Sequence, residues 1–265
     1  MTSTQTSRLA WLIVSCLCFI TPSLVIAQDE HLIAYWRFEE DSGSQVLDSI
    51  LGHDGIIHGN VQRMIGGGVG GGNALEFNGI DGYVEILDIA DFKFNNTSAT
   101  IMGWVQLYDD VNEYRPFLSI NSDVSGDDFF QFAKARSGLY EGRVFMEVHA
   151  STNHLFALSL STGASLDKYT WIHFAGVVDV DHGKVRLYMN GVLQDAENLT
   201  SFDLSSASSV TIGSTLFLSG DEYHHGALDE VAVFNRALSA SQISAFANAV
   251  PNEQATWSDI KSMFR

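Results

Sequence analysis

The chain has 265 residues, of which 46% are hydrophobic and 17% charged, with 23 glycines, 3 prolines and 2 cysteines. These proportions indicate one folded domain with short appendages, and they exclude a disordered or collagen-like chain. Thirty-two acidic residues stand against fourteen basic ones, and the resulting net charge of −18 repels phosphate backbones and anionic lipids. Nucleic acids and membrane surfaces are therefore poor candidate partners.

Residues 1–27 have the pattern of a secretory signal peptide. Arg8 precedes the apolar run Leu9–Ile20, and residues of small or modest size lead up to a cleavage point after Ala27. The apolar run is shorter than the roughly 20 residues that a membrane-spanning helix needs. We therefore expect cleavage rather than a membrane span, and a secreted or extracellular protein, with the periplasm or cell surface as alternatives.

Cleavage after Ala27 would remove both cysteines, Cys16 and Cys18. The mature chain would then carry thirteen basic and thirty-two acidic residues, a net charge of −19, and no thiol. This excludes disulfides and cysteine-ligated zinc, so core burial must hold the domain together. A lipid anchor on Cys16 stays open as an alternative, although Ile13-Val14-Ser15 matches the usual lipoprotein box poorly.

Apolar and polar residues alternate with a period of two through most of the chain, which is typical of half-buried strands. The dipeptide Asn190-Gly191 predicts a two-residue hairpin turn, because both residues tolerate positive φ. At least eleven strands with little helical pattern predict an all-β fold, an antiparallel two-sheet sandwich. The predicted strands are Leu32–Phe38, Ala74–Phe77, Tyr83–Leu87, Ala99–Leu107, Phe117–Ile120, Phe129–Ala133, Val144–Val148, His154–Leu160, Trp171–Val178, Lys184–Met189, Ser209–Gly213 and Leu228–Phe234.

One short helix is predicted near the C-terminal end of the domain. Ser239 followed by Gln242 forms a capping box, and the run Ala240–Ala249 behind it favours helix. The domain is expected over residues 28–250.

Residues 251–265 form a short C-terminal tail that opens with Pro251. Trp257, Ile260 and Phe264 share one helical face by their spacing. The tail is interpreted either as a short helix that docks on its own domain or as a sorting or anchoring signal.

Ten segments, taken in order, resemble the laminin-G-like jelly-roll domain of the concanavalin A-like lectin/glucanase superfamily. The resemblance spans about residues 31–249, and it implies two antiparallel sheets packed face to face, a jelly roll whose rim and concave-face loops bind ligands. The matching segments are Leu32–Glu39, Asp48-Ser49 with Gly52, Gly55–Gly59, Ala74–Gly79, Asp81–Val84, Thr100–Val105, Trp171–Ala175, Val185–Gly191, Ile212-Gly213 and Leu228–Ser239.

The resemblance also implies a structural calcium ion held by Asp48 and Asp229, with Glu230 and the backbone carbonyls of residues 52–59 nearby. Calcium takes six to eight oxygen ligands, which carboxylates and carbonyls supply. His53-Asp54 departs from the family, which often has Asn-Gly at this place. The alternative is that Asp229 caps a turn and Glu230 faces solvent.

No catalytic motif is present. Related glucanases carry a Glu-x-Asp-x-x-Glu run that aims two carboxylates into one cleft. The nearest fragment here, Glu39-Glu40-Asp41, has Ser44 in place of the second glutamate. Neither His-Glu-x-x-His nor Gly-x-Ser-x-Gly occurs. We therefore expect a protein without enzymatic activity.

Sugar recognition commonly pairs an aromatic platform with convergent polar groups, and the predicted loops offer both. Three tryptophans, Trp36, Trp104 and Trp171, lie in strand patterns and are expected in the core. The sequence predicts a secreted carbohydrate-binding module of lectin-like fold, stabilised by calcium; the alternatives are a protein–protein adhesion or structural surface module and, more distantly, a glycoside hydrolase. The candidate ligand-binding residues are Tyr108, Tyr114, Tyr140, Asn153, Tyr223 and His224.

Overall fold

The structure is a computed structural model that describes residues 30–108, 114–122, 129–134, 143–150, 153–158, 168–215 and 222–249. The predicted signal peptide (1–27) and C-terminal tail (251–265) lie outside these ranges. Within them, no helix is both long and apolar enough to cross a membrane.

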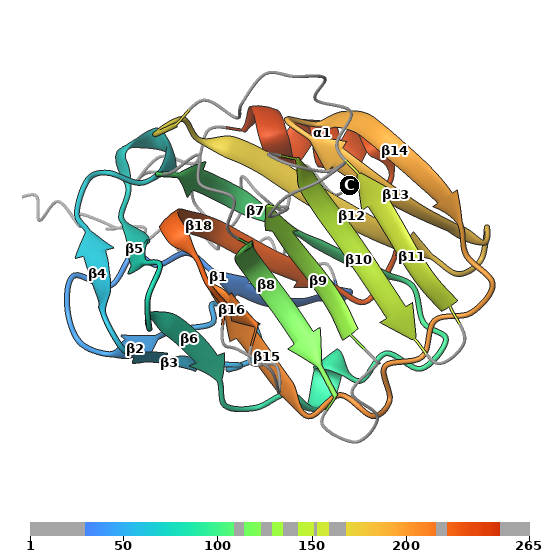
Figure 1. The fold of residues 1–265 in the computed structure, drawn as a ribbon, viewed down its shortest axis with the longest axis horizontal. Helices are drawn as coiled ribbons and strands as arrows, with labels where there is room; N and C mark the ends of the chain where they lie inside the picture. The colour runs from blue at the N-terminus through green and yellow to red at the C-terminus, as the bar shows by residue number, and fades with distance from the viewer. Residues whose placement is uncertain are drawn as a thin grey trace, which may run out of the picture.

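The described residues form two eight-stranded antiparallel sheets, one two-stranded sheet and a short α-helix (Figure 1). Sheet A has the order β14 (Val192–Asn198), β13 (Lys184–Met189), β12 (Ile172–Asp179), β7 (Ala99–Leu107), β18 (His225–Phe234), β5 (Ala74–Asn78) and β4 (Val61–Met64), and β1 (Leu32–Trp36) also pairs with β18. Sheet B has the order β11 (Asn153–Leu158), β10 (Val144–Ala150), β9 (Phe129–Lys134), β8 (Arg115–Asn121), β15 (Ser209–Ile212), β6 (Tyr83–Ile86), β3 (Gly55–His58) and β2 (Gln45–Val46). The smaller elements are β16 (Ser214–Thr215) with β17 (Glu222–Tyr223), the 3₁₀ turns η1 (Val69–Gly71) and η2 (Ala90–Phe92), and α1 (Ala240–Asn248).

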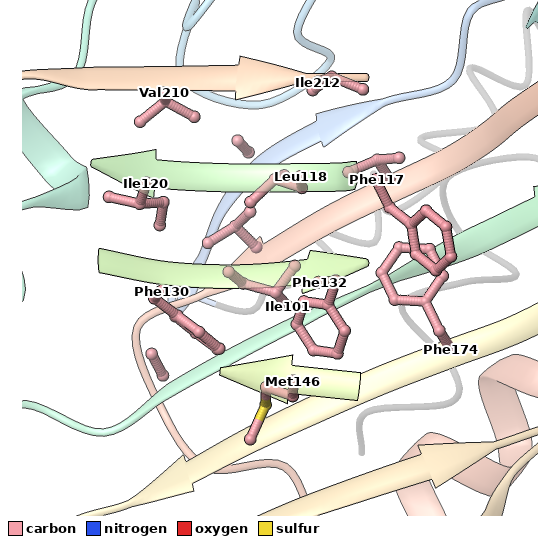
Figure 2. Close-up of a cluster of buried hydrophobic side chains, with 14 of the residues drawn as sticks. Ile101, Phe117, Leu118, Ile120, Phe130, Phe132, Met146, Phe174, Val210 and Ile212 are labelled. Carbon is pink, nitrogen blue, oxygen red and sulfur yellow. The ribbon is translucent and has the colours of Figure 1, made fainter. Parts of the chain in front are cut away.

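The core lies between the two sheets and is rich in phenylalanine (Figure 2). Phe174 of sheet A meets two rings of sheet B, with centroids 5.3 Å from Phe117 and 5.1 Å from Phe132. The period of two in each strand sends alternate residues inward. In β8, Leu118 and Ile120 face this core, so Ser119 and Asn121 face the opposite side of sheet B.

Sheet A is buried on its outer face as well, because α1 packs there. Every residue of β7 and β12 is buried, as expected for central strands of a sheet that is covered on both faces. A second apolar cluster joins the outer face of sheet A to α1, and it includes Tyr35, Met102, Tyr188 and Phe246. Figure 1 shows α1 beside β13 and β14.

The local predictions of turn and cap are confirmed. Asn190 and Gly191 have φ values of 48° and 75° between β13 and β14. The Ser239 side chain accepts a hydrogen bond from the backbone N–H of Gln242, and the Gln242 side chain accepts one from the backbone N–H of Ser239, so the capping box is complete.

The predicted two-sheet sandwich with a short C-terminal helix is confirmed. The strands absent from the sequence prediction are β2, β3, β4, β16 and β17, and most of β14. Three of these, β2, β16 and β17, have only two residues each, too few to show a period. The residues of β3, β4 and β14 are largely half-buried or exposed, so their sequences lack the regular apolar face that marks the other strands.

Because Phe174 fills the space between the sheets, we expect Phe174→Ala to lower the free energy of unfolding by about 3–5 kcal/mol. Urea denaturation with an unchanged m-value measures this loss. Val192→Ala is the control, since Val192 is 62% exposed and its truncation should change stability by less than about 0.5 kcal/mol. A loss below about 1 kcal/mol for Phe174→Ala would contradict the assignment.

Candidate functional site

A group of aromatic side chains lies where β7 ends and β12 and β18 begin. The Tyr108 ring stacks obliquely on Tyr169 at a centroid distance of 4.8 Å and meets the His225 ring at 5.9 Å. We call these three residues the Tyr108 cluster. Tyr169 is 63% exposed, so it presents its ring to solvent.

Backbone contacts fix the Tyr108 cluster in place. The Tyr108 N–H donates to the His225 carbonyl at 3.2 Å, and the Tyr169 N–H donates to the Leu107 carbonyl at 3.0 Å. The Gln106 side chain donates to the Tyr169 carbonyl at 2.9 Å. Tyr169 has a φ of 58°, a conformation that these bonds hold against its steric cost.

The Tyr108 hydroxyl is held in its protonated form. Burial raises its pKa to about 12, and the negative charge of Glu76 and the neighbouring Tyr169 add to the shift. The hydroxyl therefore remains a hydrogen-bond donor at physiological pH, with a carboxylate acceptor nearby. An exposed ring, a donor and an acceptor at one place suit a ligand that has both apolar faces and hydroxyl groups.

A second aromatic group, the Tyr83 cluster, lies on sheet B at the same end of the sandwich. His58 stacks on Tyr83 at 4.8 Å with 13° between the planes, and Tyr223 lies 6.3 Å from Tyr83. Glu85 pairs with His58 Nε2 at 2.9 Å. The Tyr223 carbonyl accepts a hydrogen bond from Arg115 Nη1 at 3.1 Å. Since Tyr223 and His225 are two residues apart, the two clusters form one aromatic rim.

His224, between these two rim residues, is buried completely instead of facing a ligand. Its ring lies between Phe77 of sheet A at 5.8 Å and Phe117 of sheet B at 5.5 Å, and its Nε2 is 3.3 Å from the Gln106 carbonyl oxygen. Burial lowers the pKa of His224 to about 3, and the positive charge of Arg115 acts in the same direction. His224 therefore belongs to the core beneath the rim.

A row of polar residues crosses the outer face of sheet B next to the rim. Glu85, Thr211, Ser119, Gln131 and Glu147 lie side by side in register, one from each of five neighbouring strands. The last four are at most 8% exposed. Gln131 Nε2 donates to Glu147 Oε2 at 2.7 Å, which leaves the Gln131 Oε1 and the Ser119 hydroxyl without a hydrogen-bond partner among the described residues.

Asn121, two residues from Ser119 on the same face, also has both amide atoms buried and unpaired within the described ranges. Buried polar groups normally find partners, because an unpaired one costs free energy. These atoms are inaccessible to solvent, so they belong to the interior of the described structure.

Tyr114 lies at the start of this row. Its ring packs edge to face on Phe145 at 5.5 Å, and its hydroxyl is buried. Burial raises the pKa of Tyr114 well above 10, and the charges of Glu147 and Glu222 raise it further. Gln131 lies close enough to oppose this shift, although the two side chains form no hydrogen bond of ordinary geometry.

Of the six predicted ligand-binding residues, the structure therefore places Tyr108 and Tyr223 on the rim, Tyr114 beside the polar row and His224 in the core. Tyr140 lies outside the described residues. Asn153 begins β11, where it pairs with Ala150 of β10. The rim residue Tyr169 was missed, because a lone tyrosine before a strand carries no periodic signal; its place two residues ahead of Trp171 was the one available hint.

The two predicted calcium ligands hold separate sets of backbone hydrogen bonds, Asp48 in the loop after β2 and Asp229 within β18. The Asp48 carboxylate accepts bonds from five backbone N–H groups at 2.8–3.1 Å, those of Tyr35 and residues 50–53. The Asp229 carboxylate accepts bonds from the N–H groups of Val69 and Glu230, both at 2.8 Å. In the part of the chain that the structure describes, no three His, Cys, Asp or Glu side chains are grouped to hold a metal ion.

Asp229 and Glu230 lie at an irregularity in the pairing of β18 with β7, and both are 1% exposed. Glu230 has a φ of 51°, and burial raises its pKa to about 8, although Arg37 Nε is 3.5 Å from its Oε1. Burial also raises the pKa of Asp229, which its two backbone hydrogen bonds oppose. The alternative that Glu230 faces solvent is thus wrong.

The described residues thus define an antiparallel two-sheet sandwich with aromatic and polar groups gathered at one end. The family model for the concanavalin A-like lectin/glucanases superfamily matches residues 78–244. Since this is more than half of the chain, the protein belongs to that superfamily. The search of curated protein sequences returned no match.

Similar solved structures are binding domains. Domain 4 of AbnA, an extracellular GH43 arabinanase from Geobacillus stearothermophilus solved with arabinotriose, has a TM-score of 0.61 at 20% identity and covers 82% of this chain and 98% of its own. The binding domain of Paraclostridial Mosquitocidal Protein 1 has a TM-score of 0.64 at 13% identity, over 83% of this chain and 52% of its own. The binding domain of botulinum neurotoxin DC, solved with rat synaptotagmin II, has a TM-score of 0.60 at 13% identity, with the coverage again 83% and 52%.

This chain therefore spans about half the length of the toxin binding domains. At these identities the likeness shows the shared fold alone.

The buried histidine beneath the rim makes stability depend on pH. The pKa of His224 falls from 6.5 to about 3 on folding, so its contribution is complete above pH 6.5 and is lost as the pH falls toward 3. The expected loss is up to about 1.4 kcal/mol per pH unit. We expect His224→Leu to flatten the decline in the free energy of unfolding between pH 6.5 and 5.0, measured by urea denaturation.

His173 is the matched comparison, because it is also fully buried and burial lowers its pKa to about 3. His173→Leu should flatten the same decline, and the double variant should flatten it about twice as much. Glu230 has the opposite effect on stability. Because burial raises its pKa from 4.5 to about 8, the protein loses stability as the pH rises through this range. Glu230 is present in the wild type and in all these variants, so it contributes equally to each curve. Parallel pH curves for the wild type and all variants would refute the assignment.

Proposed function

We propose that this protein is an exported, non-catalytic carbohydrate-binding module that contacts a glycan through the aromatic rim. The observation that carries the proposal is the exposed Tyr169 ring stacked on Tyr108, beside the Tyr108 hydroxyl and the Glu76 carboxylate. The rings offer an apolar platform, and the hydroxyl and carboxylate offer one donor and one acceptor. Export is tested by finding Gln28 as the first residue of the mature protein.

The polar groups of the rim support the same proposal, because the Tyr108 hydroxyl and the Glu76 carboxylate lie beside the exposed Tyr169 ring. A site built to hydrogen-bond hydroxyl groups discriminates strongly against ligands that lack them. The family likeness to a domain solved with arabinotriose makes arabino-oligosaccharides the first ligands to test.

A protein partner is the alternative function. Two of the similar folds are toxin binding domains, one of them solved with synaptotagmin II. Saturable binding to a defined protein, together with no binding across a glycan array, would favour this alternative. Release of reducing ends from polysaccharides would instead show hydrolysis and overturn the non-catalytic assignment.

We expect Tyr169→Ala and Tyr108→Ala each to weaken glycan binding about tenfold, equivalent to about 1.4 kcal/mol, because an aromatic platform is lost. Isothermal titration calorimetry with a glycan selected from the array measures the change. Leu87→Ala is the control, since Leu87 is 62% exposed but follows β6 at the opposite end from the rim. Unchanged affinity in both tyrosine variants would rule out the rim as the binding site.

Calcium binding remains a prediction from family resemblance. If calcium binds the folded but not the unfolded protein, it stabilises the folded state by mass action. A chelator should then lower the melting temperature. Asp229→Asn should then abolish the difference between calcium and chelator. Asp48→Ala is unsuitable as the variant, because removing its carboxylate leaves five backbone N–H groups without their acceptor. Identical melting curves with calcium and chelator would end the calcium proposal.

A further inference from the structure

A second concave surface lies at the opposite end of β7 and β12 from the aromatic rim. It is a cavity of about 830 Å³ bounded by loop 96–98, the turn between β12 and β13, and the segment that leads into α1. We call it the α1 groove. Its volume falls in the range of small-molecule binding sites, roughly 300–1,000 Å³.

Several acceptor groups of the α1 groove are already used within the protein. The Asp179 carboxylate accepts bonds from Arg186 Nη1 at 2.8 Å and from the backbone N–H and ring Nδ1 of His182 at 3.1 and 2.9 Å. Burial by itself would raise the pKa of Asp179, but these bonds lower it overall, so the side chain stays ionised.

Two side-chain amides that line the groove also use their carbonyl oxygens as acceptors within the protein. The Gln242 Oε1 accepts from the Ser239 N–H at 3.0 Å and from Arg236 Nη1 at 3.3 Å. The Asn235 Oδ1 lies 2.8 Å from His31 Nδ1. Both carbonyl oxygens are therefore committed to the walls of the groove.

Donor groups remain available on the same walls. The amide nitrogens of Asn235 and Gln242 donate no hydrogen bond to any of the described residues. Arg186 carries five N–H donors, and one of its nitrogens bonds to Asp179. These available donors, beside acceptors that are mostly used within the protein, are complementary to a ligand that is rich in acceptors.

The charge of the groove also favours a ligand that is rich in acceptors. Two arginines, Arg186 and Arg236, balance two aspartates, Asp179 and Asp181, in a chain whose net charge is −18. The groove is thus much less negative than the chain as a whole, and repulsion from distant acidic residues is screened beyond about 8 Å at physiological ionic strength.

We propose that the α1 groove binds a carboxylate group through Arg186 and the side-chain amides of Asn235 and Gln242. The guanidinium offers the paired donors that a carboxylate takes. The inference goes beyond the proposed function, because it assigns a separate site with a separate chemistry. The carboxylate has two candidate sources, a uronic acid residue of a saccharide and a free small acid.

The test uses Gln242→Glu in the full chain. Glutamate at this position keeps the capping box with Ser239, so α1 should still form, but it replaces the amide donor with a carboxylate. The probes are trigalacturonate and acetate, titrated by calorimetry. We expect trigalacturonate to bind the wild type and to bind Gln242→Glu at least tenfold more weakly. Asn235→Asp should act in the same direction.

Leu87→Ala is the matched control, since Leu87 is 62% exposed, lies outside the α1 groove and should leave trigalacturonate binding unchanged. The groove shares no residue with the aromatic rim, so failure of the rim to bind glycans would not affect this proposal, and the converse also holds. Tighter binding of trigalacturonate than of acetate would assign the site to an acidic saccharide, and equal binding would assign it to small acids. No binding of either probe, or equal affinity in wild type and Gln242→Glu, would overturn the proposal.

Discussion

The structure depends on burying one apolar face of each sheet against the other. Phe174 in sheet A and Phe117 and Phe132 in sheet B meet across this interface. Because neighbouring residues of a strand point to opposite faces, filling this core with apolar side chains sends the intervening polar residues outward. The polar row on sheet B is a direct result, since Ser119 and Gln131 alternate with core residues.

The same packing makes the aromatic rim rigid. Its residues lie at strand ends, where the ladder that closes the core also fixes their backbone. Gly226 illustrates how tight this region is, because a Cβ there would lie 1.9 Å from the Gln106 carbonyl oxygen, the oxygen that the buried His224 approaches. The rim is thus held by the strands of both sheets.

The two ends of the sandwich differ in chemistry for a physical reason. At the rim, β7, β12 and β18 meet beside exposed tyrosines, and stacking dominates. At the other end, α1 covers the outer face of sheet A with apolar side chains, and the polar groups that surround its N-terminus form a hydrogen-bonded network. One scaffold thereby presents two unlike surfaces, an aromatic platform and a groove lined with donors.

The sequence by itself determined the sandwich, the Asn190-Gly191 hairpin and the capped helix, because periodicity and turn chemistry act over a few residues. It also placed Tyr108 and Tyr223 outside the core. Only the tertiary structure decided that His224 is buried between their clusters, that Tyr169 completes the platform and that Asp48 binds backbone N–H groups of its own loop. These outcomes depend on strand pairing and on contacts between segments far apart in the chain, and local sequence patterns carry no record of which distant residue will cover a side chain.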